Sequence, residues 1–163
     1  DAARNYNHQD YDKVIFSYHG LPNSQVNKVY DDNLCDGKNC EHEVNAENYY
    51  CYKSAVYETS KLIAEKLSLP SDKYEVTFQS RLTNNWLEPF SDEVLKGYPE
   101  QGIKKVLVFS PAFTADCLET VIEIGAEYKE LFIDAGGQTL DYVPSLNFSD
   151  AWVKAIIDIV DKK

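Results

Sequence analysis

The sequence predicts an α/β domain built on a four-stranded parallel sheet with helices on both faces. Segments with the apolar pattern of β-strands alternate along the chain with segments of helical spacing. One apolar run, residues 105–109, is continuous, as in strands that are covered on both sides. Each predicted strand is followed by a loop that contains Gly, Pro, Ser or Asn. This alternating order favours crossover connections and therefore parallel strands.

The first half of the chain contains two strands and one helix. Residues 13–18 (KVIFSY) are apolar and stop at a His-Gly-Leu-Pro turn, which ends the strand. Residues 26–48 are polar and show no clear period, so we expect a loop insertion there. Apolar residues recur at helical spacing over 49–67, and Pro70 lies just beyond the end of this helix. Residues 74–78 (YEVTF) alternate in polarity and form the second strand.

The second half contains two strands and three helices. A Ser-Asp-Glu start signal opens a helix over 91–98, and the third strand follows at 105–109 (KVLVF). A longer helix is predicted from about 116 to 134, where a Gly-Gly pair follows it. A short fourth strand at 140–143 and an amphipathic helix that begins at Ser149 complete the pattern.

Composition and charge narrow the class of protein. The 163 residues carry a formal net charge of −11, which argues against a nucleic-acid partner, because phosphate binding needs clustered Lys and Arg. No stretch approaches the roughly 20 apolar residues of a membrane helix, and we expect a soluble, cytoplasmic protein. The sequence has no Met, so we expect a piece of a longer protein.

Candidate functional residues follow the predicted strands. The carboxyl ends of parallel strands meet at one edge of the sheet, where open α/β sheets bind their ligands. This edge would bring together His19, the loop over 79–86 and the segment over 110–119. A histidine directly after a strand, with Gly20 and Pro22 close behind it, stands in a position typical of functional residues.

A row of acidic residues occupies the helix predicted over 116–134. Glu119, Glu123 and Glu127 are spaced by four and form a ridge along one face. No basic residue stands four positions after Glu119 or Glu123, so the ridge suits cations or protons. Asp116 and Glu119 also fit a capping box, which is the structural alternative. An imidazole and carboxylates at one cleft suit either a divalent metal or proton transfer, and the spacing does not choose between them.

Four sequence blocks resemble one known family, the ferrochelatases, which insert ferrous iron into a porphyrin to form haem. The blocks are SYHGLP (17–22), TFQSR followed by WLEPFSDE (77–93), FSPAFTADCLETVIEI (109–124) and SLN (145–147). They stand in the order found in the family and cover nearly the whole chain outside the insertion. The resemblance looks closest to the proteobacterial type. It implies a chelatase-like lobe, the C-terminal half of the enzyme, with the N-terminal half absent from residues 1–163.

The resemblance also implies roles for particular residues. His19 matches the metal-binding histidine of the family, and Glu119 matches the glutamate opposite it across the porphyrin, so both are implied as the iron site. Glu123 and Glu127 match an acidic ridge that is thought to conduct protons or metal, which makes His19, Glu119 and Glu123 the catalytic candidates. Position 117, a Cys here, is a His in some relatives, so Cys117 is not expected to be a required ligand. The residues implied in the porphyrin pocket are Gln79, Ser80, Arg81 and Trp86.

Three of the four cysteines, Cys35, Cys40 and Cys51, fall in one short window of the insertion. The window resembles an insertion that holds a two-iron, two-sulfur cluster in some bacterial ferrochelatases. Such a cluster takes four thiolates, and the position expected for the fourth holds Val56. We therefore favour an insertion without an iron-sulfur cluster and expect a colourless protein. The alternatives are a substitute ligand (His42, Asp36 or Cys117) or zinc held by the three cysteines and His42.

The expected function is insertion of Fe²⁺, as substrate, into protoporphyrin IX, a lyase reaction that ends haem biosynthesis. The expected partners are the porphyrin, ferrous iron and the N-terminal half of the same enzyme. Alternatives are a coproporphyrin ferrochelatase, a cobalt chelatase of the same fold and a non-catalytic tetrapyrrole- or metal-binding module. Cobalt chelatases tend to have a second histidine where this chain has Glu119, which weighs against that alternative. We expect residues 1–163 to fold alone but to be inactive without the other half, which supplies one wall of the porphyrin pocket.

Overall fold

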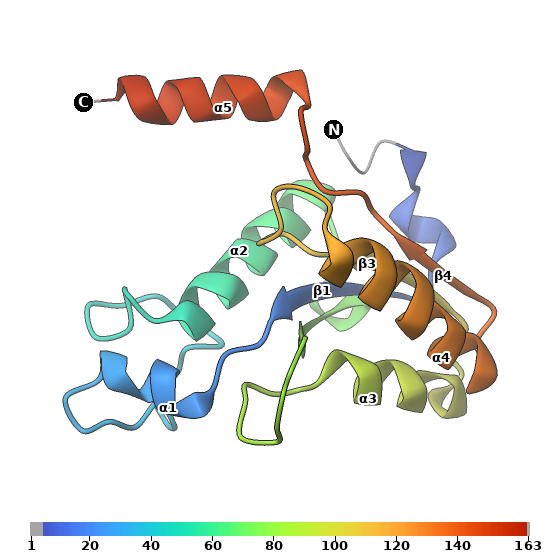
Figure 1. The fold of residues 1–163 in the computed structure, drawn as a ribbon, viewed down its shortest axis with the longest axis horizontal. Helices are drawn as coiled ribbons and strands as arrows, with labels where there is room; N and C mark the ends of the chain where they lie inside the picture. Colours follow the sequence, from blue (N-terminus) through green and yellow to red (C-terminus); the bar gives the residue numbers. More distant parts are fainter. Residues whose placement is uncertain (1–4, 163) are drawn as a thin grey trace.

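The sheet contains four parallel strands, as predicted. The computed structural model describes residues 5–162. The strands within this range are β1 (Lys13–His19), β2 (Tyr74–Gln79), β3 (Lys105–Phe109) and β4 (Thr139–Tyr142). Their order across the sheet is β2-β1-β3-β4, so β1 and β3 are central (Figure 1). His19 lies opposite Gln79 in the register of β1 and β2.

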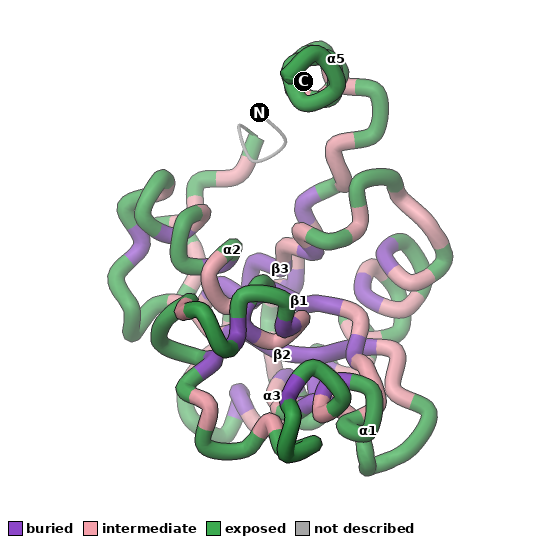
Figure 2. Tube along the Cα trace, turned by 90° about the vertical axis from the view of Figure 1, so that its left-hand side faces the viewer, coloured by how far each residue is buried: buried purple, intermediate pink, exposed green. Residues whose placement is uncertain are grey.

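Helix α2 (Tyr52–Leu67) covers one face of the sheet. Side chains alternate between the two faces along a strand, which turns Phe16 and Tyr18 of β1 toward this helix. They share a core with Val56 and Ala64 of α2, and all four are 4% exposed or less. Figure 2 shows the buried strands enclosed by more exposed segments.

The opposite face of the sheet carries α3 (Ser91–Gly97) and α4 (Lys129–Asp134), which confirms the predicted architecture. The intervening strand positions, Ile15 in β1 and Val106 and Val108 in β3, face this second core. The helical side chains that meet them are fully or almost fully buried: Leu95, Ile124 and Phe132. Short 3₁₀ turns complete the regular structure: η2 (His8–Asp10), η3 (Asn27–Val29), η4 (Ser71–Lys73) and η5 (Tyr98–Gln101).

The prediction of an α-helix over 116–134 is wrong both in where the helix starts and in the type of helix. Residues Glu119–Tyr128 form a π-helix, η6, and only α4 continues as an α-helix. Contacts from outside the helix hold its first residue and the segment before it. The side chain of Gln79 donates to the carbonyl oxygen of Glu119 over 2.8 Å, and the amide of Asp116 donates to Asn147 over 2.9 Å. Periodicity gives no warning, because residues four apart are neighbours in both kinds of helix.

Two segments do not belong to the layers that flank the sheet. After α1 (Asn23–Val26) and η3, residues 30–51 form turns and bends, a stretch that includes most of the insertion expected at 26–48. Helix α5 (Asp150–Asp161) begins after Ser149, as predicted, but it stands clear of the body (Figure 1). None of the described residues of α5 is buried. Its apolar stripe is therefore unpartnered, with side chains that are 42% to 60% exposed at Val153, Ile156, Ile157 and Val160.

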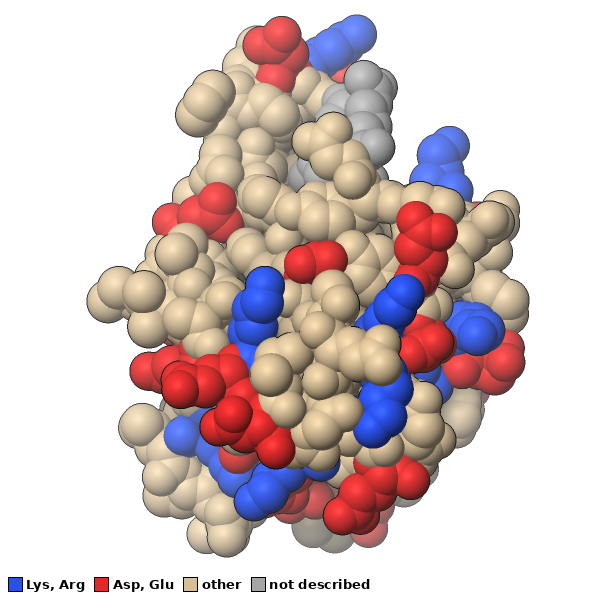
Figure 3. Space-filling model, turned by 90° about the vertical axis from the view of Figure 1, so that its right-hand side faces the viewer, with Lys and Arg blue, Asp and Glu red and all other residues tan. Residues whose placement is uncertain are grey.

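Two general properties bear on partners. Among residues 5–162 the structure has no helix of the length and apolar character that crossing a bilayer requires. Acidic and basic side chains are interspersed on the face shown in Figure 3, so the net charge of −11 does not form one continuous acidic patch there.

Candidate active site

The path of the chain across the sheet reverses between β1 and β3. From β1 the chain passes to β2 on one side and then crosses to β3 on the other side. In open α/β sheets such a reversal opens a crevice at the carboxyl ends of the two strands, and ligands bind there. His19 is the last residue of β1, and Ser110 directly follows β3. His19 therefore lies at the mouth of this crevice.

The imidazole of His19 presents a free lone pair on Nε2. Its Nδ1 lies 2.7 Å from the carbonyl oxygen of Gly20. A carbonyl only accepts hydrogen bonds, so Nδ1 carries the proton, and in the neutral ring the lone pair is on Nε2. The backbone is held as well, because the Tyr52 hydroxyl donates to the carbonyl oxygen of His19 over 2.8 Å. Burial raises the pKa of Tyr52 to about 12, so this hydroxyl remains a donor at neutral pH.

Two aromatic rings flank His19. The centroid of its ring lies 6.1 Å from that of Trp86 and 6.3 Å from that of Phe113. Gly20 permits the approach of Trp86. A β-carbon at Gly20 would lie 3.3 Å from the Trp86 ring and 3.2 Å from the carbonyl oxygen of Gln79, both tighter than ordinary contacts. The histidine is therefore bordered by flat apolar surfaces.

Glu119, the first residue of η6, lies within electrostatic reach of His19. The pKa of the Glu119 carboxyl is lowered by a hydrogen bond from its own backbone amide, by one from the Cys117 side chain and by the charge of His19. The carboxylate is therefore ionised at neutral pH and can act as an oxygen ligand or a proton acceptor. Glu119, Glu123 and Glu127 line one surface hollow of about 360 Å³, so the structure brings the predicted acidic row together.

Asp116 does not cap a helix, and its hydrogen bonds instead connect the start of η6 to the segment after β4. Its amide donates to Asn147 Oδ1 over 2.9 Å. Its carboxylate accepts hydrogen bonds of 2.8 to 3.1 Å from Asn147 Nδ2, the Ser145 amide and the Tyr142 hydroxyl. Burial acts to raise the pKa of the Asp116 carboxyl, but these hydrogen bonds outweigh it and lower the pKa. The capping box with Glu119 is therefore wrong, and Asp116 instead fastens the start of η6 to the segment after β4.

Glu123 is held by four hydrogen bonds. The donors are the Ser80 amide (2.8 Å), the Ser80 hydroxyl (2.5 Å), Gln79 Nε2 (3.2 Å) and the Tyr128 hydroxyl (2.7 Å). Burial and the bond to Glu123 raise the pKa of Tyr128 well above its usual value, so its hydroxyl remains a donor. Ser80 has a φ of +61°, an unusual conformation for serine that turns its amide and hydroxyl onto the same carboxylate. Glu123 thus joins the loop after β2 to η6.

A row of buried polar side chains lies behind the strand ends, and the sequence pattern does not predict it. Gln79 is only 1% exposed, and its Oε1 accepts from the Ser17 hydroxyl over 2.9 Å. Ser17 is bonded to Ser91, and Ser91 is bonded to Thr77. Because Gln79 Nε2 also donates to the carbonyl oxygen of Glu119, the row ties the sheet to the first residue of η6. The clearest signal is Ser17, a single polar residue inside the apolar strand β1.

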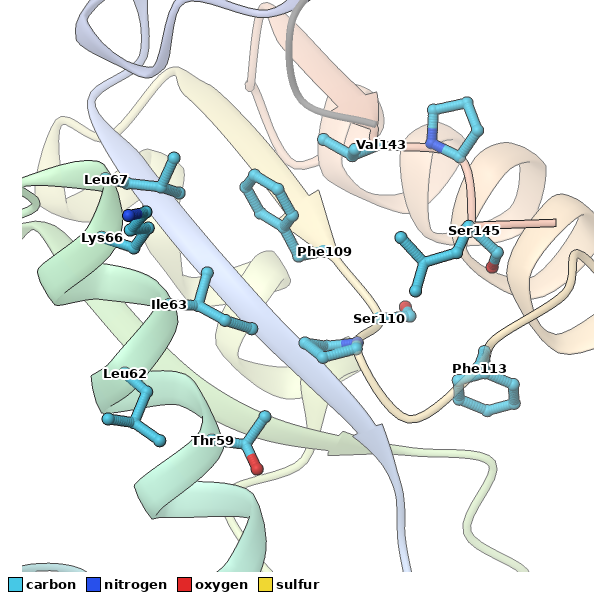
Figure 4. Close-up of a pocket in the computed structure, with 13 residues that line it drawn as sticks. Thr59, Leu62, Ile63, Lys66, Leu67, Phe109, Ser110, Phe113, Val143 and Ser145 are labelled. Atoms are coloured by element: carbon cyan, nitrogen blue, oxygen red, sulfur yellow. The ribbon is translucent and has the colours of Figure 1, made fainter. Parts of the chain in front are cut away.

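An apolar pocket of about 610 Å³ opens beside this site. Helix α2 forms one wall, and the other wall comes from the end of β3, the loop after it and the segment after β4 (Figure 4). Phe113 lines the pocket and also flanks His19, so the pocket adjoins the crevice. The volume is typical of ligand pockets, which span about 300–1,000 Å³.

The comparison with known families identifies the family of the chain. The ferrochelatase family model matches residues 1–163, the whole chain. The chain belongs to the ferrochelatase family. It is similar to the ferrochelatase of Pseudomonas putida, with 39% identity over 99% of this chain and 49% of that protein. It is 41% identical to the ferrochelatases of Coxiella burnetii (97% of this chain, 45% of that protein) and Pseudoalteromonas atlantica (93% and 37%).

Some of the residues that the ferrochelatase resemblance implies in the site already have partners for their side chains within the protein. The rings of His19 and Trp86 lie next to each other, and Glu119 lies within electrostatic reach of His19. The charge of Arg81 is already paired, at 2.9 Å with Asp92 and at 3.0 Å with Glu93, and its guanidinium lies 3.8 Å from the centre of the Phe90 ring. The assignment of Arg81 to the porphyrin pocket stays a prediction, as do those of Gln79 and Ser80. The ferrochelatase chain spans about half the length of the curated relatives it matches.

Proposed function

We propose that this chain is the iron-inserting half of a ferrochelatase that places Fe²⁺ into protoporphyrin IX to form haem. One observation carries the proposal: His19, with Nε2 free, lies at the mouth of the crevice, and the ionised carboxylate of Glu119 lies within electrostatic reach of it. Membership of the family over the whole chain supports it. Since the relatives are about twice as long as this chain, the activity is proposed for the protein that includes their other half.

The net reaction exchanges one Fe²⁺ for the two N–H protons of the porphyrin, so a site must both hold a cation and remove protons. Nε2 of His19 binds the iron above the macrocycle or takes one of the protons. Glu119 supplies an exchangeable oxygen ligand and a second proton acceptor. The acidic hollow lined by Glu119, Glu123 and Glu127 gives the protons a route to solvent.

Glu123 has a different task in this proposal. Its carboxylate is already held by four donors, which leaves little freedom to take up a metal ion. We propose that it acts by positioning, since it fixes the Gln79–Ser80 loop against η6 and so fixes the place of Glu119.

The porphyrin is a large, flat and mostly apolar ligand. Trp86 and Phe113 offer flat apolar surfaces next to His19, and the pocket next to Phe113 extends this apolar surface. We propose that Trp86 contacts the macrocycle directly. Gln79 is only 1% exposed, so we propose that it supports the site through its hydrogen bonds and does not contact the porphyrin.

We propose that the half found in the relatives but not in this chain covers the open apolar surfaces. These surfaces are the pocket and the stripe along α5, and apolar areas of this kind usually mark interaction sites. The cytoplasm is the proposed compartment, because all four cysteines are free thiols, as is usual in a reducing environment.

A substrate panel tests the proposal. The protein that includes both halves is assayed anaerobically with Fe²⁺ or Co²⁺, each with protoporphyrin IX and with coproporphyrin, and metalloporphyrin formation is followed by absorption. We expect Fe²⁺ insertion into protoporphyrin IX. Preferred insertion of Co²⁺ into another tetrapyrrole, or haem binding without turnover, would contradict the proposal.

A further inference from the structure

Three cysteines meet in the insertion, outside the site described above. The sulfur atoms of Cys35, Cys40 and Cys51 all lie within 4.8 Å of one another, and those of Cys40 and Cys51 are 3.9 Å apart. Cys40 and Cys51 are 5% and 0% exposed, whereas Cys35 is half-buried. Thiolates gathered in this way are ligands for soft and borderline metal ions.

The spacing fits one ion. Sulfurs bound to one tetrahedral ion with metal–sulfur bonds of about 2.3 Å lie about 3.8 Å apart. A two-iron, two-sulfur cluster needs four thiolates, and those on different irons stand farther apart than those on one iron. The position expected for the fourth thiolate holds Val56, which is 4% exposed and shares the apolar core with Cys40 and Cys51. The residues present therefore do not fit the two-iron cluster.

Two features of the surroundings suit metal-bound sulfur. Cys51 is the N-cap residue of the 16-residue helix α2, so its sulfur lies near the positive end of the helix dipole. The Tyr30 hydroxyl lies 2.9 Å from Cys40 Sγ. Hydrogen bonds to the ligand atoms are the usual outer surroundings of a metal site.

We propose that Cys35, Cys40 and Cys51 form a binding site for a single Zn²⁺ ion, with a fourth coordination position left to an exchangeable ligand. Within residues 5–162, His42 is not among the side chains that the structure groups with the three sulfurs, so it is not part of this site. The ion fastens the insertion to the start of α2. Tyr52, which follows Cys51, donates to the carbonyl oxygen of His19, so the ion also supports the backbone of the active site.

Cobalt substitution tests the site in the intact chain. The protein is purified under reducing conditions, treated with a chelator and titrated with Co²⁺, whose thiolate complexes absorb in the near ultraviolet while carboxylate and imidazole complexes do not. We expect this absorption to saturate at one Co²⁺ per chain and to be lost on addition of one equivalent of Zn²⁺. Cys35→Ser should weaken Zn²⁺ binding at this site by about 100-fold, the share of one ligand in a four-ligand zinc site. Cys117→Ser, which removes the cysteine outside the group, should leave it unchanged.

If the Cys35→Ser variant does not fold, alkylation of the thiols in the unaltered chain, with and without Zn²⁺, tests the same site. In the unaltered chain, Zn²⁺ should protect Cys35, Cys40 and Cys51 from alkylation together, and Cys117 should react as before. The proposal is overturned by a brown preparation with stoichiometric iron and labile sulfide. It is equally overturned if thiolate absorption is missing at one equivalent of Co²⁺, or if Zn²⁺ leaves Cys35 as reactive as it was.

Discussion

Replacing Glu123 with Gln tests whether Glu123 positions its neighbours in the acidic row or takes part in the reaction itself. In Glu123→Gln an amide group takes the place of one carboxylate oxygen. If it replaces Oε2, the 3.2 Å bond from Gln79 is lost and the Ser80 hydroxyl must reverse to accept. The bonds to Oε1 from the Ser80 amide and the Tyr128 hydroxyl remain, but without the charge.

The magnitude follows from these bonds. A hydrogen bond to a charged group contributes about 1.5–3 kcal/mol, and a neutral one contributes about 0.5–1.5 kcal/mol. Loss of charge in three bonds, at about 1 kcal/mol each, and loss of one further bond, at about 2 kcal/mol, together lower the free energy of unfolding by about 5 kcal/mol. For a chain of this size that lowers the melting temperature by roughly 10–20 °C.

Urea and thermal unfolding of the chain, followed by circular dichroism, measure this effect. Glu127→Gln is the matched control, because Glu127 is an exposed member of the same row, and it should change stability by no more than about 0.5 kcal/mol. A Glu123→Gln variant as stable as the unaltered chain, but inactive once the other half is present, would refute the positioning role and make Glu123 a participant in the reaction.

Three further changes test the framework around His19 and η6. Asp116→Asn should lower the free energy of unfolding by about 1–3 kcal/mol at pH 7. Because the folded-state pKa of Asp116 is lowered, this difference should be full above the unfolded-state pKa of about 3.9 and shrink as pH falls through the folded-state value, as urea unfolding at several pH values would show. Tyr52→Phe should lower stability by about 1 kcal/mol through loss of its bond to the carbonyl of His19, and a variant as stable as the original in urea would remove that bond from the account. Gly20→Ala should displace Trp86 and cost about 1–3 kcal/mol, so unchanged Trp fluorescence and stability would contradict the close approach.

The strands and their ends could be predicted from local patterns. Val14, Ile15 and Phe16 in β1 and the run over 105–109 are apolar because both faces of the central strands are covered. The place of His19 follows, because a residue at the end of a central parallel strand must stand at the carboxyl edge of the sheet.

The π-helix and its supports could not be predicted in this way. They depend on contacts between residues far apart in the sequence, such as Gln79 with the carbonyl of Glu119 and Asp116 with Asn147. Local spacing instead predicts an α-helix, with a capping box of Asp116 and Glu119 as the structural alternative, whereas in the structure the Asp116 amide is bonded to Asn147. The exposure of the apolar stripe of α5 could not be predicted either, because an amphipathic pattern indicates such a stripe but not the surface that covers it.

The rate of Fe²⁺ insertion tests the central claim most directly, measured at saturating protoporphyrin IX in the protein that includes both halves. We expect His19→Ala and Glu119→Gln each to lower this rate by at least about 100-fold, as loss of a proton-transfer group does, with thermal unfolding unchanged. His8→Ala, a matched histidine that precedes β1 and so lies away from the carboxyl edge, should leave the rate unchanged. Near-normal insertion by His19→Ala or by Glu119→Gln would contradict the assignment of this pair as the iron site.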